Sequence, residues 1–477
     1  MIDRPEIMDF SREFGLTANV IEKDYVLGWV LAGIFQHPEL GKNWIFKGGT
    51  CLKKCYFETY RFSEDLDFTI SEPSHLDDAF LVKCLKEIAE WIYDSAGIEI
   101  PQELIRFDVY DNNRGGISGQ GRIAYRGPMQ KRGDLPRVKL DLTTDEIIVL
   151  EPSLRNVHHP YSDTPDKGIQ IWSYSFEEVF AEKIRALAER ERPRDLYDVI
   201  HLYRHDELKP NQTLILHTLE KKCEFKGMPV PTMETFKNRA EREELESEWE
   251  NMLAHQLPAL PPFEQFWGEL PEVMDWLHGA IEKAVKEPIP LGRAAIDDTW
   301  RPPTMAQAWH TQVPFEKIRF AAANRLCVNL YYKNSYRLIE PYSLRRSEAG
   351  DLLLFALRHE TGEWRAYRID RIQSANATNI PFIPKHPIEL TSVGPISAPL
   401  LTRSSSEFST PSPNTKRLTI RRSKSRSPSS GLKHVFKCTV CGKQFTRKNY
   451  NSILNQHKNK QGYPCPGRTG IFVKTKY

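Results

Sequence analysis

Apolar residues recur along the first part of the chain at spacings that predict helices and strands in turn. Helical spacing runs from Asp9 to about Phe35, and the stretch VLGWVLAGIF within it predicts a buried helix. A short apolar strand from Ile45 ends at Gly48-Gly49-Thr50, and Leu76 to Ala96 has the period of another amphipathic helix. Alternating polar and apolar residues predict further strands at 105–110, 122–126 and 137–142. These patterns predict an α+β fold with a mixed sheet.

The segment from Ser175 to Tyr203 predicts two helices in succession. Ser175 with Glu178 matches a capping box at the start of the first helix. Pro193 interrupts the pattern, and a second helix is expected from about Arg194. From 211 to about 284 the chain is predicted to be mostly helical, with Trp and Phe side chains as core anchors.

The remainder of the chain predicts three further parts. Residues 311–397 read as a helix followed by strands with glycine turns, which predicts a small β-rich module. Residues 401–433 change abruptly to Ser, Pro, Thr, Lys and Arg, and such a stretch buries too little apolar surface to order, so we expect a disordered basic linker. Residues 434–477 form a last small module. The expected domains are therefore 1–285, 311–397, 401–433 and 434–477.

Composition narrows the class of protein. The chain has 477 residues, 40% of them hydrophobic, and a net charge of only +3, so any contact with nucleic acid must come from local basic patches. The sequence has no apolar run long enough for a membrane span and no signal-peptide pattern at its start, so we expect a cytoplasmic protein without a membrane partner. Five cysteines are scattered and three lie close together near the end, which indicates a reducing compartment and a metal rather than disulfides.

An acidic pair after a glycine turn is the strongest candidate site. Asp65 and Asp67 flank Leu66 on a predicted strand, so both carboxylates project from the same face. Two adjacent carboxylates repel unless a cation lies between them, and hard oxygen ligands near nucleotide phosphates suit Mg²⁺. Gly48 and Gly49 would let the backbone approach a phosphate closely. The alternative is an acidic surface strand after an ordinary turn.

The turn and the acidic pair, in the order FKGGT then RFSEDLDF, resemble the nucleotidyltransferase superfamily and, more narrowly, the AbiEii toxin family of abortive-infection and toxin–antitoxin systems. A later pattern, AEK followed by RDLYD, is similar to one in the same family. The resemblance implies a nucleotidyltransferase fold and a set of site residues: Gly48, Gly49 and Thr50 at the phosphates, Asp65 and Asp67 at Mg²⁺ with Asp141 as third ligand or general base, Lys183 at the triphosphate, and Asp195 or Asp198 holding the catalytic geometry. The alternatives are a surface Lys139/Asp141 pair and ordinary ion pairs on solvated helices.

Residues 311–397 resemble the WYL domain, a small β-rich, barrel-like sensing module of bacterial defence regulators. IEPYSL and RAYRIDRI carry the match, whereas the tripeptide that names the family is replaced by Leu352-Leu353-Leu354. Arg365, Arg368 and Arg371 with two tyrosines would bind a phosphate by charge and stacking, or they form the basic rim of a structural barrel.

The last module predicts a zinc finger. Cys438 and Cys441 open it, and His457 follows Leu454 as in a Cys2His2 finger. A segment of this size rarely folds without a metal, so we expect structural Zn²⁺ held by Cys438, Cys441, His457 and Cys465, although the interval before Cys465 is longer than usual. Basic residues of the linker and finger suit contact with nucleic acid.

Together these patterns predict a Mg²⁺-dependent enzyme that transfers a nucleotide from an NTP to an acceptor hydroxyl. The family resemblance implies an RNA acceptor, such as a tRNA 3′ end, and a cognate antitoxin or another defence protein as partner. Two alternatives remain: a DNA-binding regulator on an inactive nucleotidyltransferase core, and an enzyme that modifies a protein hydroxyl.

Overall fold

The computed structural model describes residues 1–111, 116–131, 133–237, 239–290, 295–297, 299–300, 315–391, 433–447, 454, 457–458, 464–465 and 469–476. The chain divides into two compact units, Met1–Leu401 and Thr402–Tyr477. The predicted linker, 401–433, lies outside the described residues except for Lys433, as do 311–314 and 392–397 at the two ends of the predicted β-rich module. Among the helices described, none combines the length and the apolar character that crossing a membrane requires.

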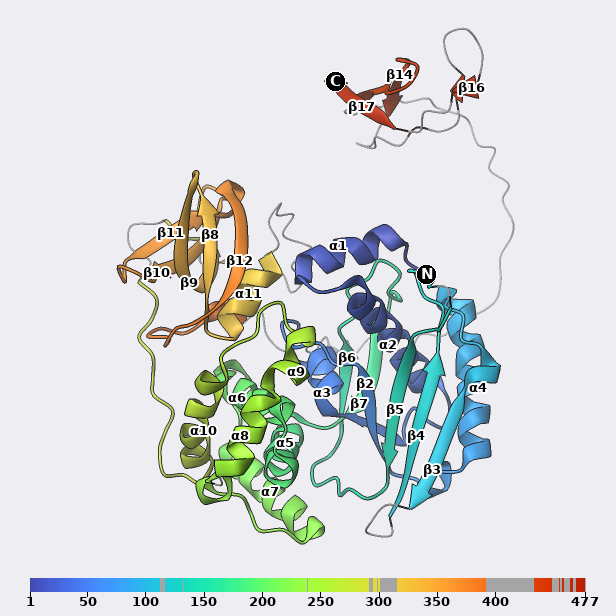
Figure 1. Ribbon diagram of the computed structural model, residues 1–477, viewed down its shortest axis with the longest axis vertical. Helices are drawn as coiled ribbons and strands as arrows, with labels where there is room; N and C mark the ends of the chain where they lie inside the picture. The colour runs from blue at the N-terminus through green and yellow to red at the C-terminus, as the bar shows by residue number, and fades with distance from the viewer. Residues whose placement is uncertain are drawn as a thin grey trace, which may run out of the picture. The chain divides into compact units, whose positions relative to one another are not determined.

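A seven-stranded mixed sheet is the centre of the first unit (Figure 1), as the sequence predicts. The strand order is β3-β4-β5-β2-β1-β7-β6. β2 is parallel to β5 and β1 is parallel to β7, whereas the other neighbouring strands are antiparallel. The strands are β1 (Trp44–Lys47), β2 (Asp65–Ile70), β3 (Arg106–Asp111), β4 (Ile117–Ala124), β5 (Arg137–Thr143), β6 (Ser153–Val157) and β7 (Ile169–Ser173).

The alternation within β5 shows how the sheet positions its polar face. Val138, Leu140 and Leu142 are buried, while Lys139 and Asp141 project from the opposite face. β1, which lies between β2 and β7, is buried along its whole length. The same sheet face therefore carries the polar residues of β2 and β5.

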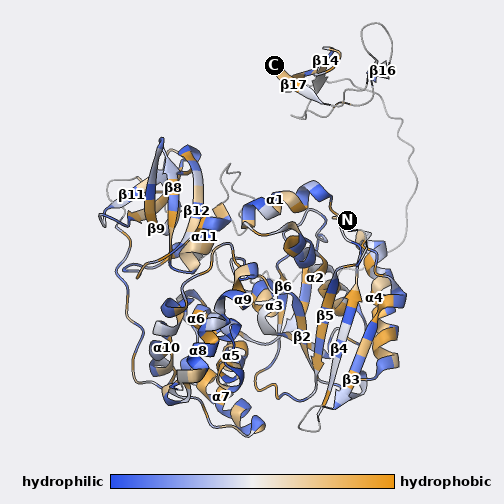
Figure 2. Cartoon of the chain, viewed as in Figure 1, coloured by the Kyte–Doolittle hydropathy of each residue, from blue (hydrophilic) through white to orange (hydrophobic). Residues whose placement is uncertain are grey.

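Two helices cover part of the sheet and pack against each other, α2 (Ala18–Gln36) and α4 (Asp78–Ala96). The single helix predicted from Asp9 to Phe35 is wrong in one respect: α1 (Arg4–Phe14) ends at Gly15, whose φ of 70° closes the helix, before α2 begins. Asp77 caps α4 at its start, and both apolar and polar residues lie along it in Figure 2. α4 thus has the amphipathic character that the sequence predicts.

A helical part follows the sheet, and Figure 1 shows it as a group beside the strands. Ser175 caps its first helix by accepting from the backbone N–H of Glu178, as predicted. The second half of the predicted capping box is wrong, because the buried Glu178 carboxylate instead accepts from two backbone N–H groups, of Val149 and Leu150, and pairs with Lys222. The helices are α5 (Phe176–Arg190), α6 (Pro193–Arg204), α7 (Gln212–Lys226), α8 (Arg239–Ser247), α9 (Trp249–Leu253) and α10 (Phe263–Leu277).

A second, five-stranded antiparallel sheet follows in the same unit, in the order β11-β10-β9-β8-β12. The helix before it is α11 (Phe315–Ala323), and the strands are β8 (Leu326–Tyr332), β9 (Ser335–Arg346), β10 (Leu352–Arg358), β11 (Trp364–Arg368) and β12 (Ile372–Pro381). Phe315 and Ile318 of α11 belong to one continuous hydrophobic core with the residues of the first sheet. This small sheet is therefore packed on the first part of the chain.

The second unit contains a three-stranded antiparallel sheet, β14-β13-β17, and a two-stranded pair. Its strands are β13 (Lys433–Cys438), β14 (Gln444–Arg447), β15 (His457–Lys458), β16 (Pro464–Cys465) and β17 (Gly470–Lys476). Its core contains Phe436, Leu454, Cys438 and Cys465, with Phe445 partly buried against them.

Candidate active site and Cys/His cluster

The glycine turn lies directly against the acidic strand. Gly48 begins the short helix α3 (Gly48–Cys51) immediately after β1 and has a φ of 80°. A Cβ at Gly48 would lie 2.2 Å from Oδ2 of Asp67, and a Cβ at Gly49 would lie 2.4 Å from Nη2 of Arg61. Thr50 is fully buried, and its hydroxyl donates to the carbonyl of Asp65. The turn is thus attached to β2, with the Asp67 carboxylate against Gly48.

Strand register brings the three predicted aspartates onto one face. Asp67 is opposite Asp141 on the parallel neighbour β5, and Asp65 is opposite Lys139. The Asp141 carboxylate pairs with Lys139 at 2.7 Å and accepts from Gln120 at 3.2 Å. The sequence predicted that Lys139 and Asp141 share a face. In the structure these two residues form an ion pair, and Asp141 also lies opposite Asp67.

Burial and mutual repulsion govern the electrostatics of this site. Burial, together with the charges of Asp141 and Asp65, raises the pKa of Asp67 to about 6. Burial, with a further contribution from Asp141, also raises the pKa of Asp65. These two carboxyl groups therefore lie in a position where a cation would relieve both desolvation and repulsion, which fits the oxygen donors that Mg²⁺ prefers.

The three aspartates do not yet form a closed ligand set. Among the described residues, the group of acidic, histidine or cysteine side chains arranged so that it could hold a metal ion is Cys438, Cys441, His457 and Cys465, and the three aspartates are not part of such a group. The ion pair between Asp141 and Lys139 is one reason, since it holds the Asp141 carboxylate. Asp65 and Asp67 offer carboxylate oxygens of the kind that Mg²⁺ takes, whereas the Asp141 carboxylate is held by Lys139.

Two further lysines lie near the acidic site: Lys47 was not predicted there, and Lys23 was interpreted mainly as part of a solvated helix start, with a place at the site as the lesser alternative. Lys47, at the end of β1, is opposite Asp67 and pairs with Glu146. Lys23 of α2 pairs with Glu64 at 2.8 Å, beside Asp65. Lys47 belongs to the FKGGT motif, so its position directly before the glycine turn could have indicated that it lies near the site.

Lys183, Asp195 and Asp198 lie in a buried ionic cluster at the junction of α5 and α6. The Lys183 ammonium pairs with Asp195 at 3.2 Å and with Asp198 at 2.7 Å. Arg61 makes two parallel bonds to Asp198, at 2.7 and 2.8 Å, and Arg190 does the same to Asp195, at 2.7 and 2.9 Å. The arginines were not predicted, although Arg61 belongs to the RFSED motif. Asp195 and Asp198 therefore bind these cations, one of which, Arg61, lies next to Gly49.

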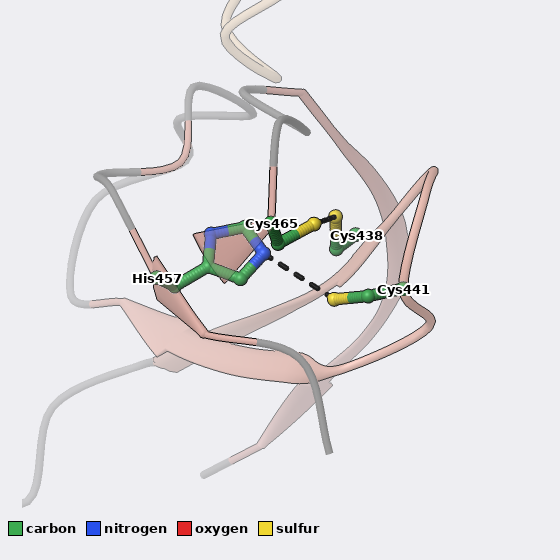
Figure 3. A group of neighbouring side chains, drawn as sticks. All are labelled: Cys438, Cys441, His457 and Cys465. Carbon is green, nitrogen blue, oxygen red and sulfur yellow. Dashed lines mark hydrogen bonds between the residues drawn. The ribbon is translucent and has the colours of Figure 1, made fainter. Parts of the chain in front are cut away.

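The four predicted zinc ligands converge in the second unit (Figure 3). Their ligand atoms all lie within 4.8 Å of one another, with the sulfurs of Cys438 and Cys465 3.9 Å apart and the Cys441 sulfur 3.3 Å from Nε2 of His457. Tetrahedral Zn²⁺ with Zn–S bonds of about 2.3 Å separates its sulfurs by about 3.8 Å. The backbone N–H of Cys441 is the main group that lowers the pKa of the Cys438 thiol to about 6, which favours the thiolate. The group can therefore bind zinc.

Two of the three basic residues predicted at the five-stranded sheet, Arg365 and Arg368, are already paired. Arg365 pairs with Glu363 at 2.6 Å, and Arg368 pairs with Asp351 at 2.7 Å and Asp370 at 2.8 Å. The rings of both tyrosines considered for stacking, Tyr342 and Tyr367, are buried. These contacts support the structural alternative for the rim of this sheet.

Comparison with known proteins agrees with the geometry. The model of the family described as "Nucleotidyl transferase AbiEii toxin, Type IV TA system" matches residues 29–277, more than half of the chain. The chain belongs to the AbiEii nucleotidyltransferase toxin family. The WYL domain model matches residues 314–377, which include α11 and the first four strands of the small sheet. This AbiEii protein therefore carries a WYL domain after its nucleotidyltransferase domain.

Solved structures that match the AbiEii protein include two of low sequence identity. MenT4, a nucleotidyltransferase toxin from Mycobacterium tuberculosis, is 15% identical, with 58% of this chain and 90% of that chain covered and a TM-score of 0.41. JHP933 from Helicobacter pylori is 17% identical, with 56% and 94% covered and a TM-score of 0.36. Among curated proteins, none matches the chain.

Proposed function

We propose that the acidic site on β2 and β5 binds Mg²⁺ and an NTP and transfers the nucleoside monophosphate to an acceptor hydroxyl. Asp65 and Asp67 hold the ion, and Asp141 joins them as third ligand or accepts the acceptor's proton. The bound ion would supply stabilisation of charge on the phosphate oxygens. The observation that supports the proposal is the close approach of the Gly48 turn to the Asp67 carboxylate, because a glycine turn beside a carboxylate suits a phosphate and its bound cation.

The transfer step follows from these roles. The acceptor oxygen forms a bond to the α-phosphorus while the bond from that phosphorus to pyrophosphate breaks, and the acceptor's proton goes to Asp141 or to solvent. Gly48, Gly49 and Thr50 position the phosphates. The three cations of the buried cluster exceed its two aspartates by one, so Lys183 and its neighbours favour the triphosphate electrostatically. Asp195 and Asp198 act as positioning residues.

We further propose RNA, and specifically a tRNA 3′ end, as the acceptor, and a cognate antitoxin as the partner that controls it. Support comes from the family, which is one of toxins in toxin–antitoxin systems. The basic residues of the second unit, such as Lys437 and Lys443 beside the Cys/His cluster, suit contact with an RNA backbone.

Labelling separates this proposal from its rivals. The full chain is incubated with Mg²⁺, each of the four labelled NTPs and total RNA, beside the Asp65→Asn/Asp67→Asn variant and an Asp134→Asn control, whose side chain is 83% exposed. We expect label in RNA with wild type and with the control, and none with the double variant. Label in protein instead would support modification of a protein hydroxyl. A chain that labels neither but shifts a DNA duplex would support the regulator.

We propose that the Cys/His cluster holds one structural Zn²⁺. Metal analysis of the purified full chain should give about one zinc per chain, and Cys441→Ser should lose most of it because one thiolate of the four ligands is removed. Cys84→Ala, at a buried cysteine of α4, is the matched control and should keep its zinc. Equal zinc content in wild type and Cys441→Ser would contradict the assignment.

A further inference from the structure

The sheet face that carries the acidic pair extends beyond it over β5, β4 and β3. The strand order places the Gly48 turn, which follows β1, on one side of β2 and these three strands on the other (Figure 1). In the proposed reaction the NTP phosphates lie at the turn, and the acceptor hydroxyl lies at Asp141 of β5. The face of β5, β4 and β3 is therefore the surface next to the acceptor.

Strand register places three cations in one row on this face. Arg106 of β3 is opposite Arg122 of β4, which is opposite Lys139 of β5. Lys139 is in turn opposite Asp65. Residues in register share a face of the sheet, and Phe107, which alternates with this row, is buried on the other face. Strands lie about 4.8 Å apart, so the row extends about 14 Å from the acidic pair, the length of about four stacked nucleotides.

The two arginines of this row are exposed, and neither forms an ion pair with a residue that the structure describes. Arg106 donates to the backbone carbonyl of Ile105 at 2.8 Å. Arg122 donates to Gln120 at 3.1 Å, and Gln120 donates to Asp141. Hydrogen bonds therefore link Arg122 to the carboxylate proposed to meet the acceptor. Without carboxylate partners, both guanidinium groups can bind phosphate oxygens.

The other charges of this face are mostly compensated. Its further cations are in three ion pairs: Lys139–Asp141, Arg126–Glu99 and Arg137–Asp134. Among the described residues of β3, β4 and β5, Asp108 is the carboxylate on this face outside those pairs, and it offsets one arginine. Outside the acidic pair, two guanidinium groups therefore face one carboxylate.

An exposed aromatic ring lies on the same face. Tyr110 is four residues after Arg106 on β3, so its side chain projects from the same face about 13 Å along the strand. It is 50% exposed. Proteins bind single-stranded nucleic acid by combining basic residues with aromatic rings on which unpaired bases stack. The ring therefore favours a single-stranded nucleic acid over other polyanions.

We infer that the open face of β5, β4 and β3 binds a single-stranded segment of the acceptor RNA, with phosphates at Arg106 and Arg122 and a base on Tyr110. This inference rests on the proposed transfer to an acceptor hydroxyl and adds the surface that holds the acceptor. None of the three residues belongs to the set assigned to the metal or the triphosphate.

Fluorescence anisotropy with the full chain and a 5′-labelled single-stranded RNA of about 12 nucleotides tests this surface. The proteins are wild type, Arg106→Gln/Arg122→Gln, Tyr110→Leu and a matched control, Lys83→Gln/Lys86→Gln. The control removes two exposed charges from α4, which packs on the opposite face of the sheet. A duplex RNA of the same length is the second probe, and each titration is repeated over a range of salt concentrations. Contacts made by the second unit are common to all the proteins.

We expect the arginine variant to bind the single strand at least about tenfold more weakly than wild type and the lysine control do. Its slope of log K against log salt should be smaller by about 1.4, because each phosphate contact with a single strand contributes about 0.7. Tyr110→Leu should bind at least about fivefold more weakly with an unchanged salt slope, because it loses stacking and no charge.

Wild-type affinity and salt slope in the arginine variant would overturn the inference, as would an equal loss in the lysine control. Equal affinity of wild type for the duplex and the single strand would overturn the single-strand assignment.

Transfer by the same proteins separates this surface from the proposed function. The arginine variant should show a KM for RNA at least about fivefold higher and an unchanged KM for the NTP. If wild type transfers nothing to RNA, the proposed function fails, and the binding differences still decide the surface. If the arginine variant transfers with the wild-type KM for RNA, the surface is wrong and the proposed function stands.

Discussion

At the scale of the residue, Gly48 connects backbone geometry to chemistry. Its φ of 80° is one that residues with a Cβ rarely adopt, and the space a Cβ would occupy is taken by the Asp67 carboxylate. A side chain there would displace the carboxylate from the turn. The position therefore requires glycine for two independent reasons.

We predict that Gly48→Ala lowers nucleotide transfer by at least about a hundredfold, because a displacement of about 1 Å at a reacting centre has an effect of this size. Gly168→Ala is the matched control, since Gly168 has a φ of 69° but no atom within 4 Å of the added Cβ. Gly168→Ala should lose about 1 kcal/mol of unfolding free energy from the strained backbone alone, and Gly48→Ala should lose more because its Cβ also meets the Asp67 carboxylate. Equal transfer rates for the two would contradict the role given to Gly48.

The acidic pair was predictable from sequence because side chains two apart on a strand share a face. Arg190 lies five residues before its partner Asp195 and was overlooked despite that short spacing, whereas Arg61 could not be assigned from local spacing. Arg61 binds Asp198, far along the chain, and nothing in the local spacing of either residue indicates that contact. Charges whose partners are distant in sequence can be recognised as a cluster only in three dimensions.

At the scale of the element, the junction of α5 and α6 is held by buried charge. Pro193 begins α6, where its missing N–H is not needed, so the helix boundary could be predicted. The parallel pairing of β5 with β2 could not, because alternation indicates a strand without indicating the direction of its neighbour. The pairing nevertheless decides that Asp141 lies beside Asp67.

Asp198→Asn should destabilise the chain by about 3–5 kcal/mol, because Arg61 and Lys183 would keep buried positive charges without their shared carboxylate. The free energy of unfolding in urea measures this effect. Asp134→Asn, which breaks an exposed pair with Arg137, should change it by no more than about 0.5 kcal/mol. A small loss in both variants would show that the buried cluster does not stabilise the α5–α6 junction.

At the scale of the whole first unit, the WYL domain is packed on the nucleotidyltransferase domain through buried charges. Arg319 of α11 binds Glu58 at 3.2 Å and also pairs with Glu316, whose carboxylate accepts from Thr59 at 2.9 Å. Each domain could be recognised from its own motifs, but this interface could not, because its residues belong to neither motif.

This interface should respond to pH through Glu58. Burial raises the pKa of Glu58 from its ordinary 4.5 to about 7. A carboxyl group with a raised pKa in the folded state holds its proton longer than in the unfolded state, so its contribution to stability falls as pH rises from 4.5 to about 7. Between about pH 5 and about pH 8, wild type should lose stability relative to Glu58→Gln. Thermal unfolding of both proteins measures the difference, and a difference that does not change with pH would contradict this assignment.

The measurement that tests the central claim most directly is Mn²⁺ binding to the zinc-loaded full chain, followed by electron paramagnetic resonance with a non-hydrolysable NTP analogue present. Mn²⁺ replaces Mg²⁺ at oxygen ligands and is observable. We predict that wild type and Asp134→Asn bind the ion equally and that Asp67→Asn binds it at least about tenfold more weakly. Unchanged affinity in Asp67→Asn would contradict the claim that the carboxylate beside Gly48 holds the metal of a nucleotidyltransferase.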